Sequence, residues 1–379
     1  MPRPLVKWRI GVLAPLRRSL AEKHLFSGVV VSRPAPFAWP ATIAGTLSYK
    51  NLYRASTRAG RWTMTEGFGL GQEATQDGRF ERQESRFRGW ITPDGSSGFP
   101  AAAGRYHLYV SLACPWCHRT VIVRRLKGLE DVVKVSYVDP FRDERGWAFS
   151  GGRFTDQVNG WALLSDAYAA SDPGFTGRIT VPVLWDTRDH VIVSNESADI
   201  VRMFNDGFGA LARSSVDLYP PALREQIDAV NAFVYENVNN GVYRAGFAAT
   251  QEAYEKAYEQ LFAGLDELED RLGSSRFLVG ATPTEAYWRL FPTLVRFDAV
   301  YYTHFKCNRR RLVEYPNLWG YARDLYQQPG IAETVALEEI KRHYFTTQDF
   351  LNPSRIIPRG PHVDFLAPHD RAAIGAKAA

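Results

Sequence analysis

Cysteine is scarce in this chain of 379 residues, which contains only Cys114, Cys117 and Cys307. Three cysteines cannot build the disulfide framework of a small secreted protein, and their scarcity is typical of proteins in a reducing compartment. Long hydrophobic runs are also missing. The three valines at 29–31 are followed at once by serine, arginine and proline, far short of the ~18 apolar residues that a membrane helix needs. We therefore expect a cytoplasmic protein without a membrane-spanning helix.

Acidic residues are nearly absent from residues 1–63, which carry one glutamate against eleven lysines and arginines. This segment has a net charge of +10, so the rest of the chain contributes −5 to the overall +5. Three interpretations stay open for it: an organelle transit sequence, a disordered tail, or sequence upstream of a true start at Met64. No nucleic-acid partner is expected for the slightly acidic body, and the KCNRRR run at 306–311 is interpreted as a solvated or intersubunit patch.

The pattern of the remaining chain predicts an α/β domain followed by an all-α domain. The alternating YHLYVSLA run from Tyr106 favours a strand. It is followed by a helix closed by Gly128, a strand, a long insertion, two strands and a helix. The expected organisation is a basic extension at 1–63, an irregular arm at 64–105, an α/β domain at 106–206, an all-helical domain at 220–346 and a C-terminal tail at 347–379.

Two helices of the all-α part are marked by their sequence. In the segment 251–273 the apolar residues are three and four apart, which places them on one helix face, and Gly273 is expected to end the helix. These apolar residues are Tyr254, Tyr258, Leu261, Leu265, Leu268 and Leu272. The next helix is expected to begin with Thr282 as N-cap, Pro283 at the first position and Glu285 completing a capping box.

The CPWC run at 114–117 stands where the first strand meets the first helix. Cys114 is then at or just before the helix N-terminus, where unpaired N–H groups and the helix dipole lower a thiol pKa. Pro115 fits the first turn because no backbone donor is lost there. Cys117 has two open interpretations: a thiol that resolves a disulfide at Cys114, or a small apolar side chain on the buried helix face.

The same run fits two other patterns less well. CPWCH matches the C-x-x-C-H attachment sequence of c-type haem, but no secretory signal supports the export that this chemistry needs. Zinc requires four ligands, and no second cluster matches Cys114, Cys117 and His118. A reactive thiol is therefore favoured, and no metal is expected.

Two further sequence features are consistent with thiol chemistry. Proline in a strand is tolerated only at an edge or a special turn, so Val181 before Pro182 is expected to present its backbone groups to the thiol if the bond is cis. An extended thiol peptide could then pair with it. Glu196 and Ser197 open a helix, where they act as an ordinary cap or hold the ammonium and carboxylate of a γ-glutamyl group.

Long specific runs also carry a resemblance to a known family. They span most of residues 79–361 and include DGRFERQESRFRGWIT, RYHLYVSLACPW, HRTVIVRRLKGLED, TGRITVPVLWD, VNNGVYRAGFA, HFKCNRRRLVEYPNLWGYARDLYQ, PGIAETV and IKRHYF. On these runs the chain resembles the glutathione transferase superfamily and, more narrowly, the glutathionyl-hydroquinone reductases of the xi class. The resemblance implies a thioredoxin-like domain followed by a helical domain, and a homodimer.

The resemblance also assigns roles to residues of this chain. It implies that Cys114 is the nucleophile and Tyr243 the proton donor. Glutathione contacts are implied for Trp147, Arg178, Ile179, Thr180, Val181, Glu196 and Ser197. Tyr301 and Tyr344 are implied to surround the substrate and to favour the thiolate by hydrogen bonding, although the adjacent Tyr302 competes for the place of Tyr301.

Two departures from the family pattern stand out. Many members have alanine where this chain has Cys117, so an internal disulfide could add glutaredoxin-like activity. The capping pattern usual in transferases has an acid where Tyr287 stands, and the predicted capping box from Thr282 to Glu285 is expected to cap the helix in its place.

The implied reaction uses glutathione as co-substrate. The Cys114 thiolate attacks the glutathionyl sulfur of a substituted quinol, a mixed disulfide forms and free hydroquinone leaves. A second glutathione then restores the thiolate and departs as oxidised glutathione. Two other functions stay open: a thiol-disulfide oxidoreductase that removes glutathione from mixed disulfides with the CPWC pair, and a binding or scaffold protein of the same fold.

Overall fold

The computed structural model describes residue 75 and residues 77–374, and the basic extension lies outside the described residues. The α/β part is built on a four-stranded mixed sheet. Its strand order is β4 (Lys134–Tyr137), β3 (Tyr106–Val110), β5 (Val183–Asp186) and β6 (Val191–Ser194). Strand β3 is parallel to β4 and antiparallel to β5, and β5 is antiparallel to β6. The predicted succession of strands and helices along the chain is confirmed.

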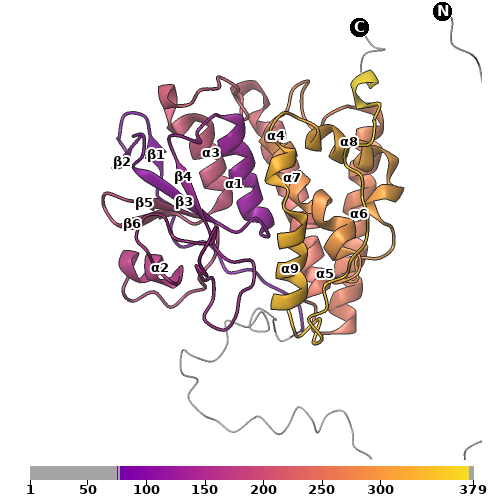
Figure 1. Ribbon diagram of the computed structural model, residues 1–379. Helices are drawn as coiled ribbons and strands as arrows, with labels where there is room; N and C mark the ends of the chain where they lie inside the picture. Colours follow the sequence, from indigo (N-terminus) through magenta and orange to yellow (C-terminus); the bar gives the residue numbers. More distant parts are fainter. Residues whose placement is uncertain (1–74, 76, 375–379) are drawn as a thin grey trace, which may run out of the picture. The chain divides into compact units, whose positions relative to one another are not determined.

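Three helices belong to this sheet. They are α1 (Pro115–Leu126), α2 (Ser165–Ser171) and α3 (Ser197–Arg202). Helices α1 and α3 contact each other and lie between the sheet and the helical part, whereas α2 contacts β6 (Figure 1). Gly128 follows α1 with a φ of +62°, a conformation that favours glycine, as expected for a helix closed by this residue.

The chain from residue 224 to residue 347 is helical, which confirms the predicted fold class. Its helices are α4 (Arg224–Val234), α5 (Gly241–Gly246), α6 (Gln251–Ser274), α7 (Glu285–Arg296), α8 (Pro316–Tyr326) and α9 (Leu337–Thr347). Short π-helical or 3₁₀ turns precede, separate or follow these helices: η4 (Met203–Gly207), η5 (Gly209–Leu211), η6 (Pro221–Leu223), η7 (Tyr235–Asn239), η8 (Phe297–Tyr301), η9 (Leu312–Glu314), η10 (Ala332–Thr334) and η11 (Arg371–Ala373).

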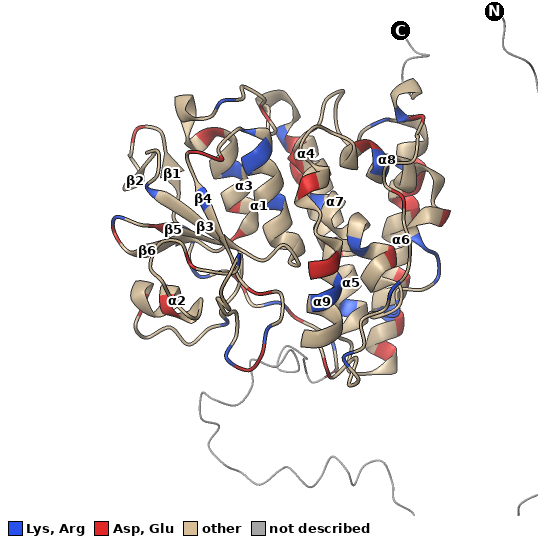
Figure 2. Cartoon of the chain, viewed as in Figure 1, with Lys and Arg blue, Asp and Glu red and all other residues tan. Residues whose placement is uncertain are grey.

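Helix α6 follows the predicted stripe. Its four leucines are buried, and Thr250 caps it by accepting a hydrogen bond of 3.2 Å from the N–H of Ala253. The helix continues to Ser274, so Gly273 lies inside it rather than ending it. Acidic and basic residues are interspersed along the helical part (Figure 2). In the KCNRRR run, Arg309 pairs with Asp266.

The predicted start of the next helix is wrong. The N-cap of α7 is Thr284 rather than Thr282, and the side chain of Thr284 makes no capping bond. Glu285 does not complete a box because its buried carboxylate is used elsewhere: it accepts bonds of 2.7 Å from Asn231 and 2.9 Å from Arg202. Instead, the hydroxyl of Tyr287 donates to the carbonyl of Thr282 at 3.0 Å and so fixes the turn before the helix.

The arm before the sheet is tied to the α/β part. It contains the two-residue strands β1 (Ile91–Thr92) and β2 (Phe99–Pro100), which pair in parallel. The N–H of Gly89 donates to the carbonyl of Val193 at 2.8 Å, and Arg88 pairs with Asp199. These bonds tie the arm to β6 and α3.

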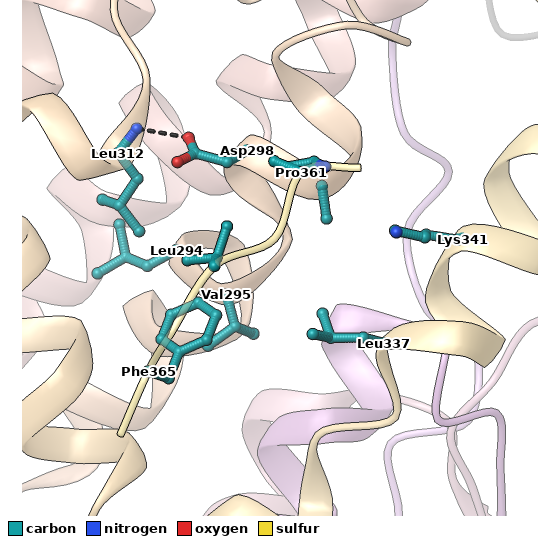
Figure 3. A pocket seen from close by; sticks show the side chains of 10 residues that line it. Leu294, Val295, Asp298, Leu312, Leu337, Lys341, Pro361 and Phe365 are labelled. Atoms are coloured by element: carbon teal, nitrogen blue, oxygen red, sulfur yellow. Dashed lines mark hydrogen bonds between the residues drawn. The ribbon is translucent and has the colours of Figure 1, made fainter. Parts of the chain in front are cut away.

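The C-terminal segment packs on the helical part. Residues of this segment, α7 and α9 enclose a cavity of about 20 Å³, the size of a water molecule (Figure 3). Lys341 donates to the carbonyl of Arg359 at 2.9 Å, and Asp298 accepts from the N–H of Leu312 at 2.5 Å. Arg371 donates to the carbonyl of Leu272 at 2.7 Å. In the part of the chain that is described, no helix has the length and hydropathy of a membrane span.

Candidate active site

Cys114 is the N-cap of α1, as the sequence predicts. Its backbone is extended, with φ of −77° and ψ of 124°, and Pro115 occupies the first helical position. The thiol is 9% exposed, and its sulfur lies 3.7 Å from the carbonyl oxygen of Val181. Cys114 therefore stands where the chain passes from strand to helix. Its side chain is almost fully buried but still lines a pocket.

The surroundings of Cys114 favour its thiolate. Burial raises the pKa, but hydrogen bonds from the Cys117 thiol and from the N–H groups of Cys117 and Trp116, with the charge of Arg296, lower it to about 7. Burial raises the pKa of Cys117, which is fully buried and so remains a protonated donor. The two thiols are thus unequal, with one nucleophile and one hydrogen-bond donor.

The segment opposite the thiol has the predicted special backbone. The peptide bond between Val181 and Pro182 is cis. The carbonyl of Val181 accepts from the protonated Cys114 thiol, and its N–H has no hydrogen-bond partner among residues 75 and 77–374. An extended ligand can therefore use the Val181 N–H without displacing a protein group.

Three tyrosine hydroxyls form a buried cluster beside the thiol. Tyr243 of α5 and Tyr344 of α9 are 2.5 Å apart at their oxygens, and Tyr301 of η8 lies 3.0 Å from Tyr344. Burial raises the pKa of all three, so the hydroxyls are protonated at neutral pH. Tyr302 is half-buried and stands outside the cluster. The structure thus places Tyr301, not its neighbour, against the other two.

The pocket at Cys114 has a volume of about 90 Å³. It brings together many residues that the sequence singles out: Cys114, Trp147, Arg178, Ile179, Thr180, Val181, Tyr243 and Tyr344. Tyr301 supports Tyr344 from behind and does not line the pocket, and neither Glu196 nor Ser197 does. Among the described residues that line the pocket there are three arginines and no acidic residue, so the pocket suits an anionic ligand.

Glu196 and Ser197 form the start of α3. The carboxylate of Glu196 accepts from the N–H of Ala198 at 2.9 Å and from the hydroxyl of Ser85 at 2.9 Å. The hydroxyl of Ser197 lies 3.4 Å from the same carboxylate. This geometry is that of a helix cap, and their binding of a ligand stays a prediction.

Sequence reasoning missed several lining residues, namely Phe80, Arg82, Trp116, Arg142, Phe247, His343 and Gln348. The ring of His343 stacks on Trp147 with centroids 5.1 Å apart. Burial lowers the pKa of His343 to about 3, and its Nδ1 lies 2.7 Å from the carbonyl of Pro140, so the ring is neutral. Arg82 and His343 stand inside the quoted runs DGRFERQESRFRGWIT and IKRHYF, which is the only sequence signal for them.

Arg296, at the end of α7, links the helical part to the thiol. It is fully buried, and its guanidinium donates to the carbonyls of Ala113 at 3.0 Å and Leu112 at 2.9 Å. It also donates to Nδ1 of His118 at 3.1 Å, and Nε2 of His118 lies 2.8 Å from the Thr334 hydroxyl. Both ring nitrogens of His118 are therefore occupied. Within the described residues no group of three or more histidines, cysteines and acids could hold a metal.

Replacing Arg296 with methionine is expected to raise the pKa of Cys114 from about 7 toward its ordinary value. The variant removes a buried positive charge near the thiolate and the donors that fix the two carbonyls before it. The measurement is the pH dependence of alkylation by iodoacetamide. Arg296→Lys keeps the charge and should retain part of the shift. An unchanged midpoint in Arg296→Met would show that this charge does not act on the thiol.

The chain is similar to known protein families and solved structures. The family models for the glutathione S-transferase N-terminal and C-terminal domains match residues 113–206 and 251–324. The chain is 52% identical to the glutathionyl-hydroquinone reductase YqjG of Escherichia coli (strain K12), over 78% of this chain and 92% of that protein. It is 48% identical to the glutathionyl-hydroquinone reductase PcpF of Sphingobium chlorophenolicum, over 75% and 90%.

Solved structures give the same result. The glutathione-bound structure of E. coli YqjG superposes with a TM-score of 0.74 and covers 76% of this chain and 96% of that one. A Xi-class transferase from Natrialba magadii is 50% identical, has a TM-score of 0.77 and covers 80% and 93%. The chain therefore belongs to the glutathione S-transferase family, in the Xi-class group of enzymes that includes the glutathionyl-hydroquinone reductases.

Proposed function

We propose that this enzyme reduces glutathionyl-hydroquinones to hydroquinones with glutathione as the reductant. The observation that carries the proposal is one pocket that holds a thiol with a pKa near 7 and two protonated tyrosine hydroxyls. A nucleophile for sulfur and an acid for carbon are the two groups that the cleavage of a carbon–sulfur bond requires. The names of the relatives YqjG and PcpF support the same reaction.

Glutathione is a dianion at its carboxylates and carries one ammonium, so its pocket should be basic with one acidic contact. Arg142 and Arg178 line the pocket near Trp147 and supply positive charge. The N–H of Val181, which has no partner within the described part of the chain, can pair with the peptide backbone of glutathione as one rung of a ladder. We assign Glu196 as the acid that contacts the ammonium. Its carboxylate would then accept hydrogen bonds from both the ammonium and the Ser85 hydroxyl.

The first half-reaction transfers the glutathionyl group to the enzyme. The Cys114 thiolate attacks the glutathionyl sulfur, a disulfide bond forms between the two sulfurs, and the sulfur–carbon bond to the ring breaks. The ring carbon gains a proton, and the electron pair of the broken bond passes into the ring. Tyr243 supplies this proton, because its hydroxyl lines the pocket and Tyr344 and Tyr301 behind it can pass on a replacement.

The second half-reaction restores the thiolate. The thiolate of a second glutathione attacks the glutathionyl sulfur of the mixed disulfide, and glutathione disulfide leaves. The pKa of about 7 makes Cys114 a good leaving group as well as a nucleophile at neutral pH. Each turnover therefore consumes one free glutathione and releases one hydroquinone and one glutathione disulfide, half of which comes from the substrate.

A second function is favoured by Cys117. Its thiol is hydrogen-bonded to Cys114, so it is placed to displace glutathione from a Cys114 mixed disulfide and form an internal disulfide. Full burial and a raised pKa oppose this attack in the resting structure. We therefore assign Cys117 first as a donor to the Cys114 thiolate and second as a resolving thiol in deglutathionylation.

One comparison separates the two functions. Wild type and Cys117→Ala are assayed with a glutathionyl-hydroquinone and with the mixed disulfide of glutathione and 2-mercaptoethanol. We expect wild type to act on both and Cys117→Ala to keep its quinol activity within about fivefold, the effect of one lost hydrogen bond. Loss of quinol activity in Cys117→Ala would contradict the single-nucleophile mechanism, and a wild type without quinol activity would contradict the proposed function.

The cytoplasmic location and the homodimer remain predictions. The location rests on the scarcity of cysteine and the homodimer on the family resemblance, and neither carries any part of the mechanism. The active site as described is built from residues of one chain.

A further inference from the structure

Arg82 is a cation at the mouth of the active site that the mechanism above does not use. It belongs to the arm, and its guanidinium carbon lies over three aromatic rings, at 4.9 Å from the centroid of Trp116, 5.0 Å from Tyr243 and 5.5 Å from Phe80. All four residues line the pocket together with Cys114. The arm therefore brings a positive charge into the pocket that holds the reactive thiol and the Tyr243 hydroxyl.

Most of the hydrogen-bonding capacity of Arg82 is unused. Its Nε donates to the amide oxygen of Asn240 at 3.2 Å. Within the described residues its two terminal nitrogens donate to no protein group, and no carboxylate pairs with the guanidinium. By contrast, Arg86 on the same arm pairs with Asp172 at 2.8 Å and Arg88 pairs with Asp199. The terminal N–H groups of Arg82 thus remain able to donate hydrogen bonds, and the planar guanidinium is well suited to bind an anionic oxygen.

The chemistry of the substrate requires a charge to appear on such an oxygen. When the ring carbon that bears sulfur accepts a proton from Tyr243 and a hydroxyl conjugated with it releases its own proton to water, the ring becomes a neutral dienone with one carbonyl group. Attack of the Cys114 thiolate on sulfur then breaks the carbon–sulfur bond, and its electron pair moves through the ring to that carbonyl oxygen. The ring leaves as a phenolate, and glutathione remains on Cys114. Atoms and charge balance, because the negative charge passes from the thiolate to the aryl oxygen.

We propose that Arg82 recognises this aryl oxygen and makes the enzyme specific for glutathione conjugates of phenolic rings over aliphatic glutathione disulfides. The inference rests on the proposed function. A cation that binds the oxygen as it gains charge stabilises the transition state more than the bound substrate. The position of Arg82 over Tyr243 serves the same step, because burial raises the pKa of Tyr243 and the charge of Arg82 opposes that rise.

The substrate ring also has a surface on which to lie. Trp116 is contacted by Arg82 and, at 4.3 Å, by the buried Arg119. Trp116 is half-buried and lines the pocket, so the part of its indole that these two cations leave uncovered can contact an aromatic substrate. Aromatic side chains that pack on a ring, with a cation that can donate hydrogen bonds to the ring oxygen, are the features expected of a binding site for a phenolic ring.

The test compares two substrates that share glutathione and Cys114 but differ in the leaving group. Arg82→Gln is assayed with a glutathionyl-hydroquinone and with the mixed disulfide of glutathione and 2-mercaptoethanol. We expect kcat/KM for the quinol to fall about tenfold to hundredfold, the effect of losing a charge-assisted hydrogen bond, while the disulfide reaction stays within about twofold. Arg82→Lys should recover part of the quinol activity.

Arg86→Gln is the matched control, since it removes an exposed arginine of the same arm that lies outside the pocket. An equal loss on both substrates in Arg82→Gln would overturn the inference, because it would place Arg82 in glutathione binding or folding. No loss on either would overturn it too. If wild type reduced the disulfide but not the quinol, the proposed function itself would fail, an outcome that the wild-type assay alone reveals.

Discussion

Serine in place of Cys114 is expected to lower kcat/KM for a glutathionyl-hydroquinone by about 10⁴-fold or more, as for the loss of other enzymic nucleophiles. A hydroxyl does not ionise near neutral pH and cannot form a disulfide with the glutathionyl sulfur. The N-cap position accepts serine readily, so the fold should be retained. The rate of hydroquinone release, followed by chromatography, is the measurement.

Cys307→Ser is the matched control for this variant. Cys307 is fully buried in the helical part, and burial raises the pKa of its thiol, so it takes no part in exchange at neutral pH. Its replacement should leave the rate of hydroquinone release per folded enzyme unchanged. Full activity in Cys114→Ser would show that Cys114 is not the nucleophile. Loss of kcat in a folded Cys307→Ser would show that Cys307 takes part in the reaction, against our assignment.

Phenylalanine in place of Tyr243 is expected to lower kcat for the quinol by about 10²- to 10⁴-fold, the usual contribution of a general acid. The variant keeps the ring that contacts Arg82 but removes the hydroxyl bonded to Tyr344. The mixed disulfide with 2-mercaptoethanol should react at nearly the wild-type rate, because its leaving thiolate needs no proton at carbon. The measurement is kcat for both substrates at one pH.

The two remaining tyrosine positions sharpen this prediction. Tyr301→Phe removes a hydroxyl that touches Tyr344 but does not line the pocket, and it should cost less than Tyr243→Phe. Tyr302→Phe alters a half-buried residue outside the cluster and should have no effect on kcat. Equal losses on quinol and disulfide in Tyr243→Phe would show a role in glutathione binding instead of proton donation.

The sequence predicted what depends on local pattern. The strand order and the stripe of α6 follow from alternation and from spacings of three and four, which are properties of single elements. The location of Cys114 at a helix N-terminus follows from the strand before it and from Pro115 after it. A resemblance over long runs added the roles of residues whose contacts no local pattern encodes.

Contacts between distant segments could not be predicted in this way. The capping box from Thr282 fails because Glu285 is drawn into a buried cluster with Arg202 of α3 and Asn231 of α4. Arg82 lies 34 positions before Trp116, and only the folded arm brings the two together. The choice between Tyr301 and Tyr302 likewise depends on the turn η8, whose π-helical geometry sets which side chain faces Tyr344.

The transfer of glutathione to Cys114 is tested most directly in a single turnover. Reduced Cys117→Ala enzyme, which lacks the resolving thiol, is mixed with one equivalent of glutathionyl-hydroquinone without free glutathione, and its intact mass is recorded. We predict one hydroquinone released per chain and one glutathionyl group added, located at Cys114 by peptide mapping and removed by added glutathione. Hydroquinone release without an adduct at Cys114 would contradict the mechanism.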